Sequence, residues 1–213
     1  MHATVPQRPV PPGRLGVRPQ DMTSIRLDNP IATERLRLRE FVPSDWPAMQ
    51  AASDAKAMAF FDEPPYSEED AKAWIRRAID NQYQDPRMRY EFAVELASEP
   101  KVIGYCDLVL RYPVECRMAF SGYRYIPKYW GRGYGTEAER AILDFGFRQL
   151  GLTRVSMICD PENVASWRLM EKCGLRREGH EHLSEWSTKR NKAIDQYRYA
   201  ILKEEWEKQN TQQ

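Results

Sequence analysis

A glycine-rich turn between an apolar strand and a helix restricts the fold of this chain more than any other feature. The segment from Tyr125 to Glu137 reads YIPKYWGRGYGTE, with Gly131, Gly133 and Gly135 inside the turn. Glycine permits positive φ and lets a ligand approach the backbone closely. The first amides of a helix have no internal partner and lie at the positive end of its dipole. The turn therefore predicts an anion site suited to a pyrophosphate, to which Arg132 adds positive charge.

The spacing of the glycines separates this turn from two better-known phosphate loops. It is GxGxG, whereas dinucleotide-binding folds carry GxGxxG. No GKS or GKT follows it, so a P-loop is excluded. Taken by itself, the turn is equally compatible with a glycine bend that only redirects the chain from strand to helix.

Periodicity along the rest of the chain predicts one mixed α/β domain. Strands are expected where apolar residues alternate, and helices where they recur at helical spacing behind a capping pattern such as Ser67 to Asp70. The order is strand, two helices, three strands, helix, strand, helix and two strands. The expected strands are at 35–39, 92–96, 102–110, 118–126, 155–159, 175–182 and 193–202.

Length and composition set the domain limits. The 213 residues are 42% hydrophobic, which suffices for one domain with a real core. Residues 1–22 hold five prolines and few apolar side chains, so we expect a disordered extension, with a polyproline ligand as the alternative. The domain is expected over residues 23–208, followed by a disordered tail at 209–213.

Charge and cysteine content exclude several classes of protein. The net charge of +1 lacks the basic excess of a nucleic-acid binder. No run of about 18 apolar residues predicts a membrane span, and no apolar leader is apparent. The spacing of the cysteines fits neither zinc nor a redox motif, which indicates reduced thiols in a cytoplasmic protein. A bridge between Cys106 and Cys116 across a hairpin stays open.

Four segments in this order resemble the GNAT superfamily of N-acetyltransferases, and in particular its ribosomal-protein N-acetyltransferase (RimJ/RimL-like) branch. They are TERLRLR at 33–39, GYRYIPKYWGRGYGTEA at 122–138, DPENVASWRLMEKCGLRREG at 160–179, and the closing residues Tyr199 and Glu205-Trp206. The second and third segments together are the most specific part of the resemblance.

The resemblance implies a single-domain α/β fold, with a mixed sheet of about seven strands that splays at the cofactor cleft, flanked by about four helices. It implies acetyl-CoA between strands 116–126 and 153–159. The implied cofactor-binding residues come from the strand end, the glycine turn and the following helix: Tyr125, Ile126, Trp130, Gly131, Arg132, Gly133, Tyr134, Gly135, Thr136, Asn163 and Ser166. The pantetheine arm is expected to pair with the backbone at Tyr125 and Ile126.

The expected reaction is direct attack of a neutral amine on the thioester. A lysine-like amine has a pKa of about 10.4, so about one in a thousand is neutral at pH 7, and the site gains by removing a proton. Relatives often carry a glutamate where this chain has Phe120, and a tyrosine acid where it has Met170. Ser166 is then the candidate donor to the thiolate, and the Ile126 amide is the candidate donor to the carbonyl.

The base is less defined by the sequence. Asp107 and Glu115 are the candidate carboxylates, and proton release to ordered water is the alternative. Ser166 in turn has the alternative of contacting only helix backbone. Because Phe120 replaces an acid, a degenerate acyl-CoA-binding module also stays open, as does an interaction protein in which the glycines only form a turn.

No metal site is expected. His180 and His182 share a strand face, but no carboxylate–cysteine set accompanies them in the sequence, so surface histidines or a wall of the acceptor pocket are the interpretations kept. The expected partner is an amine acceptor, either a small molecule or a protein N-terminus. The chain is expected to be a monomer or a homodimer.

Overall fold

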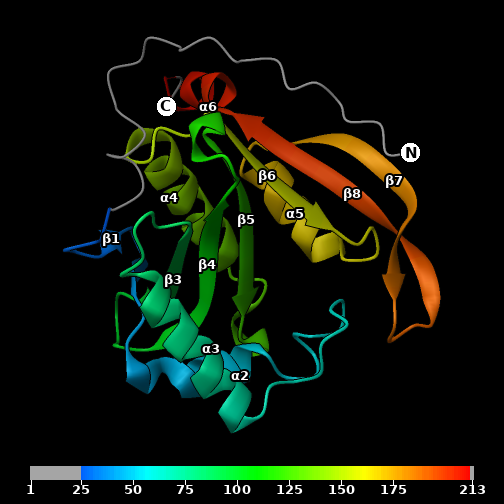
Figure 1. Cartoon of the computed structure of the whole chain (residues 1–213), viewed down its shortest axis with the longest axis horizontal. Coiled ribbons are helices and arrows are strands. Elements are labelled where there is room, and N and C mark those ends of the chain that lie inside the picture. Colours follow the sequence, from blue (N-terminus) through cyan, green and yellow to red (C-terminus); the bar gives the residue numbers. More distant parts are fainter. Residues whose placement is uncertain (1–24, 212–213) are drawn as a thin grey trace, which may run out of the picture.

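A computed structural model describes residues 25–211. Its strands form one eight-stranded sheet in the order β1-β2-β3-β4-β5-β6-β8-β7, with helices between them (Figure 1). The strands are β1 (Ile31–Ala32), β2 (Leu36–Glu40), β3 (Arg89–Leu96), β4 (Val102–Leu110), β5 (Met118–Tyr125), β6 (Arg154–Cys159), β7 (Arg176–Ser187) and β8 (Lys192–Leu202). The helices are α2 (Trp46–Ala52), α3 (Glu68–Asn81), α4 (Tyr134–Arg148), α5 (Val164–Lys172) and α6 (Lys203–Thr211).

The expected fold class is confirmed, including the order of the central elements. Strands β1 to β5 form an antiparallel meander, and β6, β8 and β7 continue the sheet as antiparallel neighbours. The pairing of β5 with β6 is the parallel one, because α4 carries the chain across the sheet between them. Short edge strand β1 and C-terminal helix α6 are the elements that periodicity did not predict.

Local sequence explains why the helices begin where they do. Ser67 caps α3: its hydroxyl accepts from the Asp70 amide at 3.1 Å, and the Asp70 carboxylate accepts from the Ser67 amide at 3.0 Å. This reciprocal pair satisfies two amides that the helix leaves free. One face of α3 then buries Ala71, Trp74 and Ile75.

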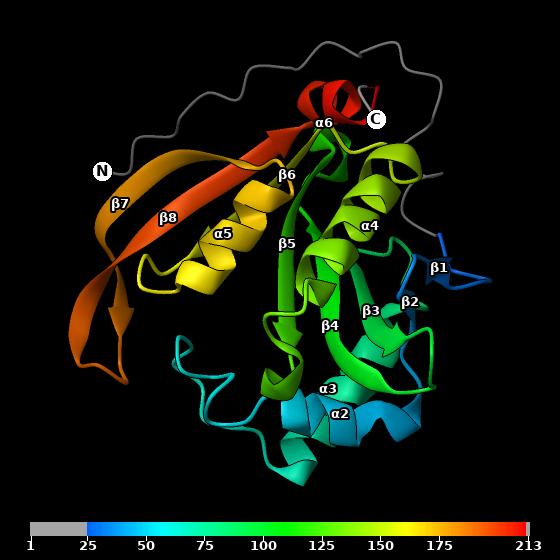
Figure 2. The same ribbon diagram turned by 180° about the vertical axis from the view of Figure 1, so that it is seen from behind.

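Helices cover both faces of the sheet, and each face has its own core. On one face α2 and α3 pack on Ala93 and Tyr105, with Trp74 at their centre. On the other, α4 and α5 pack on the larger cluster that includes Cys106 and Leu108, and Figure 2 shows these two helices in front of the sheet. Successive residues of a strand face opposite sides, so residue parity along β4 and β5 decides which layer each side chain meets.

The C-terminal boundary differs from the sequence prediction. Residues 209–211 were expected in a disordered tail, but they continue α6. The Asn210 side-chain amide donates to the Trp206 carbonyl at 2.8 Å, and the Gln209 side chain donates to the carbonyl of Gly174, so the last turn has partners. The predicted extension at 1–22 and residues 212–213 lie outside the described residues.

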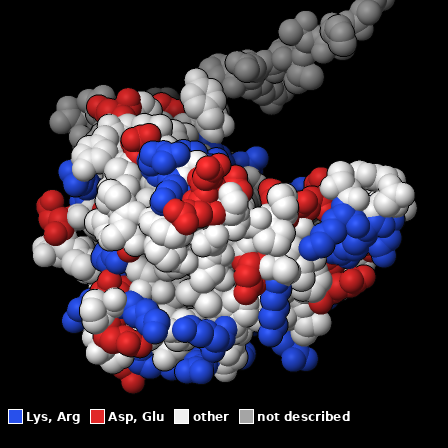
Figure 3. All heavy atoms as spheres, turned by 90° about the horizontal axis from the view of Figure 1, so that it is seen from below, with Lys and Arg blue, Asp and Glu red and all other residues white. Residues whose placement is uncertain are grey.

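Surface and thiol chemistry within residues 25–211 are unexceptional. All four cysteines are free, so no bridge joins Cys106 and Cys116. The face of the molecule in Figure 3 carries acidic and basic side chains intermixed, as expected for a net charge of +1. No helix among the described residues is long and apolar enough to cross a membrane.

Candidate active site

The two central strands separate at the middle of the sheet. β5 and β6 are paired only from Met118 to Phe120 and from Arg154 to Ser156. Beyond these positions β5 stays paired with β4 up to Tyr125, while β6 stays paired with β8 up to Cys159. A wedge-shaped gap therefore opens between them, as the family resemblance implied, and its wide end lies at Tyr125 and Cys159.

The register of β4 and β5 determines which backbone groups face this gap. The Ile126 amide donates to the Ile103 carbonyl at 2.9 Å, and the Arg111 amide donates to the Met118 carbonyl at 2.8 Å. In an antiparallel pair the direction of the N–H and C=O groups alternates along the strand. The backbone groups of Tyr123 and Tyr125 therefore point away from β4 and towards the gap.

This register overturns one prediction. The Ile126 amide was expected to polarise the thioester carbonyl, but it is already used in the sheet. The Tyr125 carbonyl also has a partner, because the Trp130 indole N–H donates to it at 2.8 Å. The gap-facing residues Tyr123 and Tyr125 therefore each offer a backbone amide to a ligand. Trp130 instead stabilises the end of β5 through its hydrogen bond to the Tyr125 carbonyl.

The glycine turn has the geometry of an anion site. Gly131 and Gly133 have φ of 74° and 81°, which glycine adopts without strain. Gly133 is the N-cap of α4 and offers no side chain, so the amides of Tyr134, Gly135 and Thr136 have no partner within the helix. Arg132 is exposed beside them.

Gly135 has a different reason to be glycine. A Cβ atom there would lie 2.7 Å from Leu169 Cδ1 and 3.2 Å from Tyr125 Cε2. The first turn of α4 thus sits directly against α5 and against the end of β5. This close packing brings the unpaired amides next to the wide end of the gap.

An ion pair from the N-terminal part of the chain braces the turn. Arg35 Nε donates to Glu137 Oε2 at 2.7 Å, and Arg35 Nη1 donates to the Arg132 carbonyl at 3.1 Å. Thr33 Oγ1 and the Arg35 amide both donate to Glu137 Oε1, at 2.6 and 2.8 Å. Burial raises the pKa of Glu137, but these hydrogen bonds outweigh it and leave the pKa lowered. Glu137 is therefore a charged anchor that links the turn to the start of β2.

Helix α5 places Ser166 beside β5, and Asn163 lies at the start of this helix. Asn163 is the N-cap of α5, and its Oδ1 accepts from the Ser166 amide at 3.2 Å. The Ser166 hydroxyl lies 2.9 Å from the Tyr123 hydroxyl, which comes from β5. Burial raises the pKa of Tyr123 further above its usual range, so its hydroxyl keeps its proton. Two adjacent hydroxyls thus line the α4–α5 side of the gap.

A carboxylate lies on the opposite side of the sheet. Asp107 pairs with Gly122 of β5 and shares the parity of Tyr105, which places it on the α2–α3 face. Burial, together with the charge of Glu91, raises the pKa of Asp107 to about 7, while the Gly122 amide, Arg89 and Arg124 oppose the shift. Asp107 can therefore both accept and release a proton near neutral pH.

These features agree with the matches to known proteins. A family model described as an acetyltransferase (GNAT) domain matches residues 35–176, more than half of the chain. The chain belongs to the GNAT acetyltransferase family.

Individual relatives support the assignment. The uncharacterised N-acetyltransferase YnaD of Bacillus subtilis is 37% identical over 177 residues, covering 83% of this chain and 98% of that protein. The crystal structure of a GNAT-family acetyltransferase from Bacillus anthracis aligns with a TM-score of 0.71 at 32% identity, covering 81% of this chain and 98% of that one.

A more distant neighbour shares the fold. The spermidine N-acetyltransferase of Vibrio cholerae, solved in complex with CoA and spermine, aligns with a TM-score of 0.69 at 23% identity, covering 82% of this chain and 99% of that one. With the family established, this GNAT protein is an amine N-acetyltransferase, and acetyl-CoA is its acetyl donor.

The structure separates the two carboxylates proposed from sequence. Glu115 is exposed in a 3-10 turn, Val114–Cys116, before the start of β5. That is the closed end of the gap, where β5 and β6 are still paired, so Glu115 does not belong to this GNAT site and its prediction was wrong. Phe120 also lies near that end and carries the Arg111 guanidinium over its ring at 5.2 Å.

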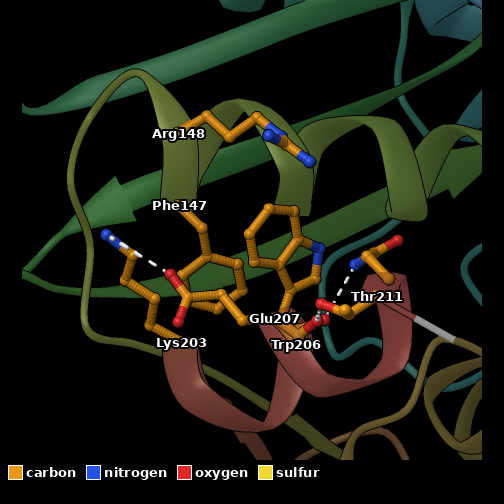
Figure 4. Close-up of a pocket in the computed structure, with 7 residues that line it drawn as sticks. Phe147, Arg148, Lys203, Trp206, Glu207 and Thr211 are labelled. Carbon is orange, nitrogen blue, oxygen red and sulfur yellow. Dashed lines mark hydrogen bonds and ion pairs between the residues drawn. The ribbon is translucent and has the colours of Figure 1, made fainter.

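Two surface hollows occur among the described residues. One lies between the end of α4 and α6, where Trp206 packs against Phe147 and Lys203 pairs with Glu207 (Figure 4). Helix α4 has 15 residues, so this hollow is about 20 Å from the glycine turn. A second hollow borders the turn itself and is lined by Arg35, Gly133, Thr136, Glu137, Arg140 and Lys172.

Sequence reasoning missed two features of the GNAT site. The pairing of Tyr123 with Ser166 joins residues 43 positions apart, and no local pattern reveals it. The Arg35–Glu137 brace spans 102 positions. Its signal was the presence of both residues in conspicuous segments, TERLRLR and GRGYGTEA, which were interpreted separately.

Proposed function

We propose that the acceptor is a primary amine, carried by a small molecule or by a protein N-terminus, and that the chain belongs to the ribosomal-protein N-acetyltransferase (RimJ/RimL-like) branch. One observation carries the proposal: the Asp107 carboxylate, whose pKa burial raises to about 7, and a pair of hydroxyls lie on opposite faces of the sheet, beside the gap where its strands part. An amine can therefore enter from one face and a thiol leave by the other.

The residues of the gap fit acetyl-CoA. The amides of Tyr134, Gly135 and Thr136 would hold its pyrophosphate, with Arg132 beside them. A Cβ atom at Gly135 would lie 2.7 Å from Leu169 Cδ1, so any larger residue would require the Leu169 side chain to move for the helix start to stay so close to the gap. Tyr123 and Tyr125 offer backbone amides to the pantetheine arm, and Asn163 would lie on its other side.

The chain's own residues then perform three tasks. Asp107 accepts a proton from the incoming ammonium group, which makes the amine nucleophilic. A gap-facing amide, that of Tyr123 or Tyr125, stabilises the negative charge that develops on the carbonyl oxygen. Ser166, held by Tyr123, donates a hydrogen bond to the departing thiolate. Acetyl-CoA supplies the activated acyl group.

The α2–α3 loop contacts the tip of the β7–β8 hairpin, and we call these two segments the rim of the acceptor side. The α2–α3 loop carries Asp62, whose carboxylate accepts from the Ser187 hydroxyl at 2.8 Å and from the Thr188 amide at 2.9 Å at the tip of the β7–β8 hairpin. In the same loop Phe61 lies 4.6 Å from the Arg124 guanidinium of β5. This contact between loop and hairpin would border the path by which the amine enters.

Calorimetry and a thiol-release assay test the proposal together. We expect micromolar binding of acetyl-CoA to the full chain, and thiol release with spermidine or with N-terminal peptides of free α-amine. Gly133→Val should abolish binding, because valine strains φ of 81° and covers the amides. Binding without release on any amine would reject the acceptor class, whereas unaltered binding by Gly133→Val would reject the pyrophosphate assignment.

A further inference from the structure

The β7–β8 hairpin brings two histidines and an aspartate to one point, outside the catalytic gap. His180 Nε2 lies 2.6 Å from Asp195 Oδ2, and His182 Nδ1 lies 3.1 Å from the same oxygen. One donor atom from each of the three side chains lies within 4.8 Å of the others. Sequence reasoning set these histidines aside because no carboxylate–cysteine set accompanied them along the chain. The structure brings the carboxylate of Asp195 to them from the neighbouring strand.

The hairpin is shaped to make this cluster. The register of β7 against β8 shifts between Glu181 and Glu185, which marks a bulge. Leu183 in the bulge has φ of 49°, and its amide donates to Asp195 Oδ1 at 2.9 Å. That bond fixes the carboxylate and leaves Oδ2 directed at both imidazoles. The Tyr197 ring packs edge-on against His180 at 4.9 Å and restricts its rotation.

From this geometry we infer that His180, His182 and Asp195 form a binding site for one divalent transition-metal ion, with Zn²⁺ as the natural candidate. Two imidazoles and a carboxylate form a donor set that suits zinc, whereas Mg²⁺ and Ca²⁺ prefer oxygen ligands alone. Around a tetrahedral zinc with bonds of about 2.0–2.1 Å, the donor atoms lie about 3.3 Å apart. The two imidazole nitrogens lie 2.6 and 3.1 Å from the carboxylate oxygen and within 4.8 Å of each other, so side-chain rotations alone bring the three donors to that spacing.

The surroundings favour an accessible, exchangeable ion. The side chains of His182, His180 and Asp195 are 74%, 38% and 29% exposed, so solvent can supply the remaining ligand. The Leu183 amide bond to the second carboxylate oxygen is the kind of outer contact that orients a ligand. Because the ligands come from both strands, the ion joins β7 to β8 near the tip that holds Asp62.

Metal titration of the full, untagged chain tests the site. Co²⁺ is the probe, because its visible absorption reports imidazole coordination, and Zn²⁺ is then added as competitor. We expect one Co²⁺ per chain, displaced by one Zn²⁺, and a rise in melting temperature with Zn²⁺. His182→Ala and Asp195→Asn should each weaken binding at least tenfold and remove the thermal shift. Asparagine keeps an oxygen for the Leu183 amide, so that variant retains the hairpin.

A matched control comes from the third histidine of the chain. His2 lies outside the described residues, and His2→Ala should bind Co²⁺ as the parent does. The inference is overturned if the parent protein binds no Co²⁺ or Zn²⁺ at 50-fold excess, or if His182→Ala and Asp195→Asn both bind as tightly as the parent.

Discussion

At the scale of single residues, Asp107 is the candidate for a dedicated general base, and its replacement tests whether the protein uses one. Its pKa of about 7 places it in the range where a general base is most effective. We expect Asp107→Asn to lower kcat/KM for the amine by about 100-fold or more, without a change in acetyl-CoA affinity. The parent rate should rise with pH through about 7, and the variant should lose that limb of the profile.

Thiol release measured from pH 5.5 to 9 checks this. Glu115→Gln is the control, since it removes an exposed carboxylate at the closed end of the gap, and its profile should match the parent's. An Asp107→Asn enzyme with the parent's rate and profile would mean that the amine loses its proton to water.

The paired hydroxyls of Ser166 and Tyr123 give a second residue-scale prediction. Each hydroxyl orients the other at 2.9 Å, so either loss should disturb the same interaction with the thiolate. We expect Ser166→Ala and Tyr123→Phe each to lower kcat by about 10-fold and the double variant to lose little more, because groups that act as a unit are not additive. Tyr112→Phe, at a tyrosine 90% exposed, is the control. If the double variant instead loses the product of the two single-variant factors in kcat, the two hydroxyls act independently.

Residue identity alone could predict part of this site. Positive φ at Gly131 and Gly133 followed from the spacing of the turn, since glycine is the residue that tolerates it. The Ile126 amide was misassigned because the direction of a strand amide depends on register with a partner strand. The partner of Ser166 was invisible for a similar reason, since the sheet and α5 must both be placed before Tyr123 meets it.

At the scale of elements, the brace between β2 and α4 sets the shape of the glycine turn. Arg35 holds Glu137 and the Arg132 carbonyl at once, so Arg35→Ala should raise the Kd for acetyl-CoA by about 10-fold while kcat at saturation changes little. Lysine cannot reproduce the planar fork, so Arg35→Lys should rescue little of the loss.

Calorimetry with acetyl-CoA measures this effect. Arg37→Ala on the same strand is the matched control, because Arg37 is an exposed arginine next to the buried Leu36 and Leu38. Equal affinity in the Arg35→Ala and Arg37→Ala proteins would show that the turn holds its shape without the brace.

The rim formed by the α2–α3 loop and the β7–β8 hairpin should affect binding of the amine acceptor rather than binding of the acyl donor. Removing the carboxylate in Asp62→Ala releases the Ser187 hydroxyl and the Thr188 amide. We expect the KM for the amine to rise about fivefold, with the Kd for acetyl-CoA unchanged, because the glycine turn lies elsewhere. Steady-state kinetics at saturating acetyl-CoA give the amine KM. Glu63→Ala, one position along the same loop, should behave as the parent, and an equal shift in both variants would refute a specific role for Asp62.

At the scale of the whole molecule, the order of the helices and strands was predictable from the sequence. How these elements pack, and which side chains they bury, was not. Alternation and helical spacing located the central strands and helices, since burial of one face leaves its period in the sequence. Helix α6 escaped because its pattern is mostly polar and only Trp206 is buried, against Phe147 of α4. The buried acid on α4, Glu139, also gave no sign, since a glutamate at that spacing normally faces solvent.

Glu139 makes the stability of the entire fold depend on pH. It is fully buried, and its Oε1 accepts from the Ser121 hydroxyl at 2.8 Å, while Oε2 has no partner among the described residues. Burial, with the charge of Asp107, raises its pKa to about 8, although the Ser121 bond opposes the shift. A folded-state pKa above the unfolded value means that the folded protein binds more protons, so stability falls as pH rises from about 5 towards 8.

Replacing Glu139 by glutamine tests this linkage. The free energy of unfolding of the parent should decrease by up to about 1.4 kcal/mol per pH unit for each such group across this window. Glu139→Gln keeps the acceptor for Ser121 but cannot ionise, so the variant should lose less stability with pH and become the more stable protein near pH 9. Denaturant unfolding at pH 6 and 9 measures the difference. Glu185→Gln, at an exposed site on β7, should follow the parent, and a Glu139→Gln protein with the parent's pH dependence would show that Glu139 is not the group responsible.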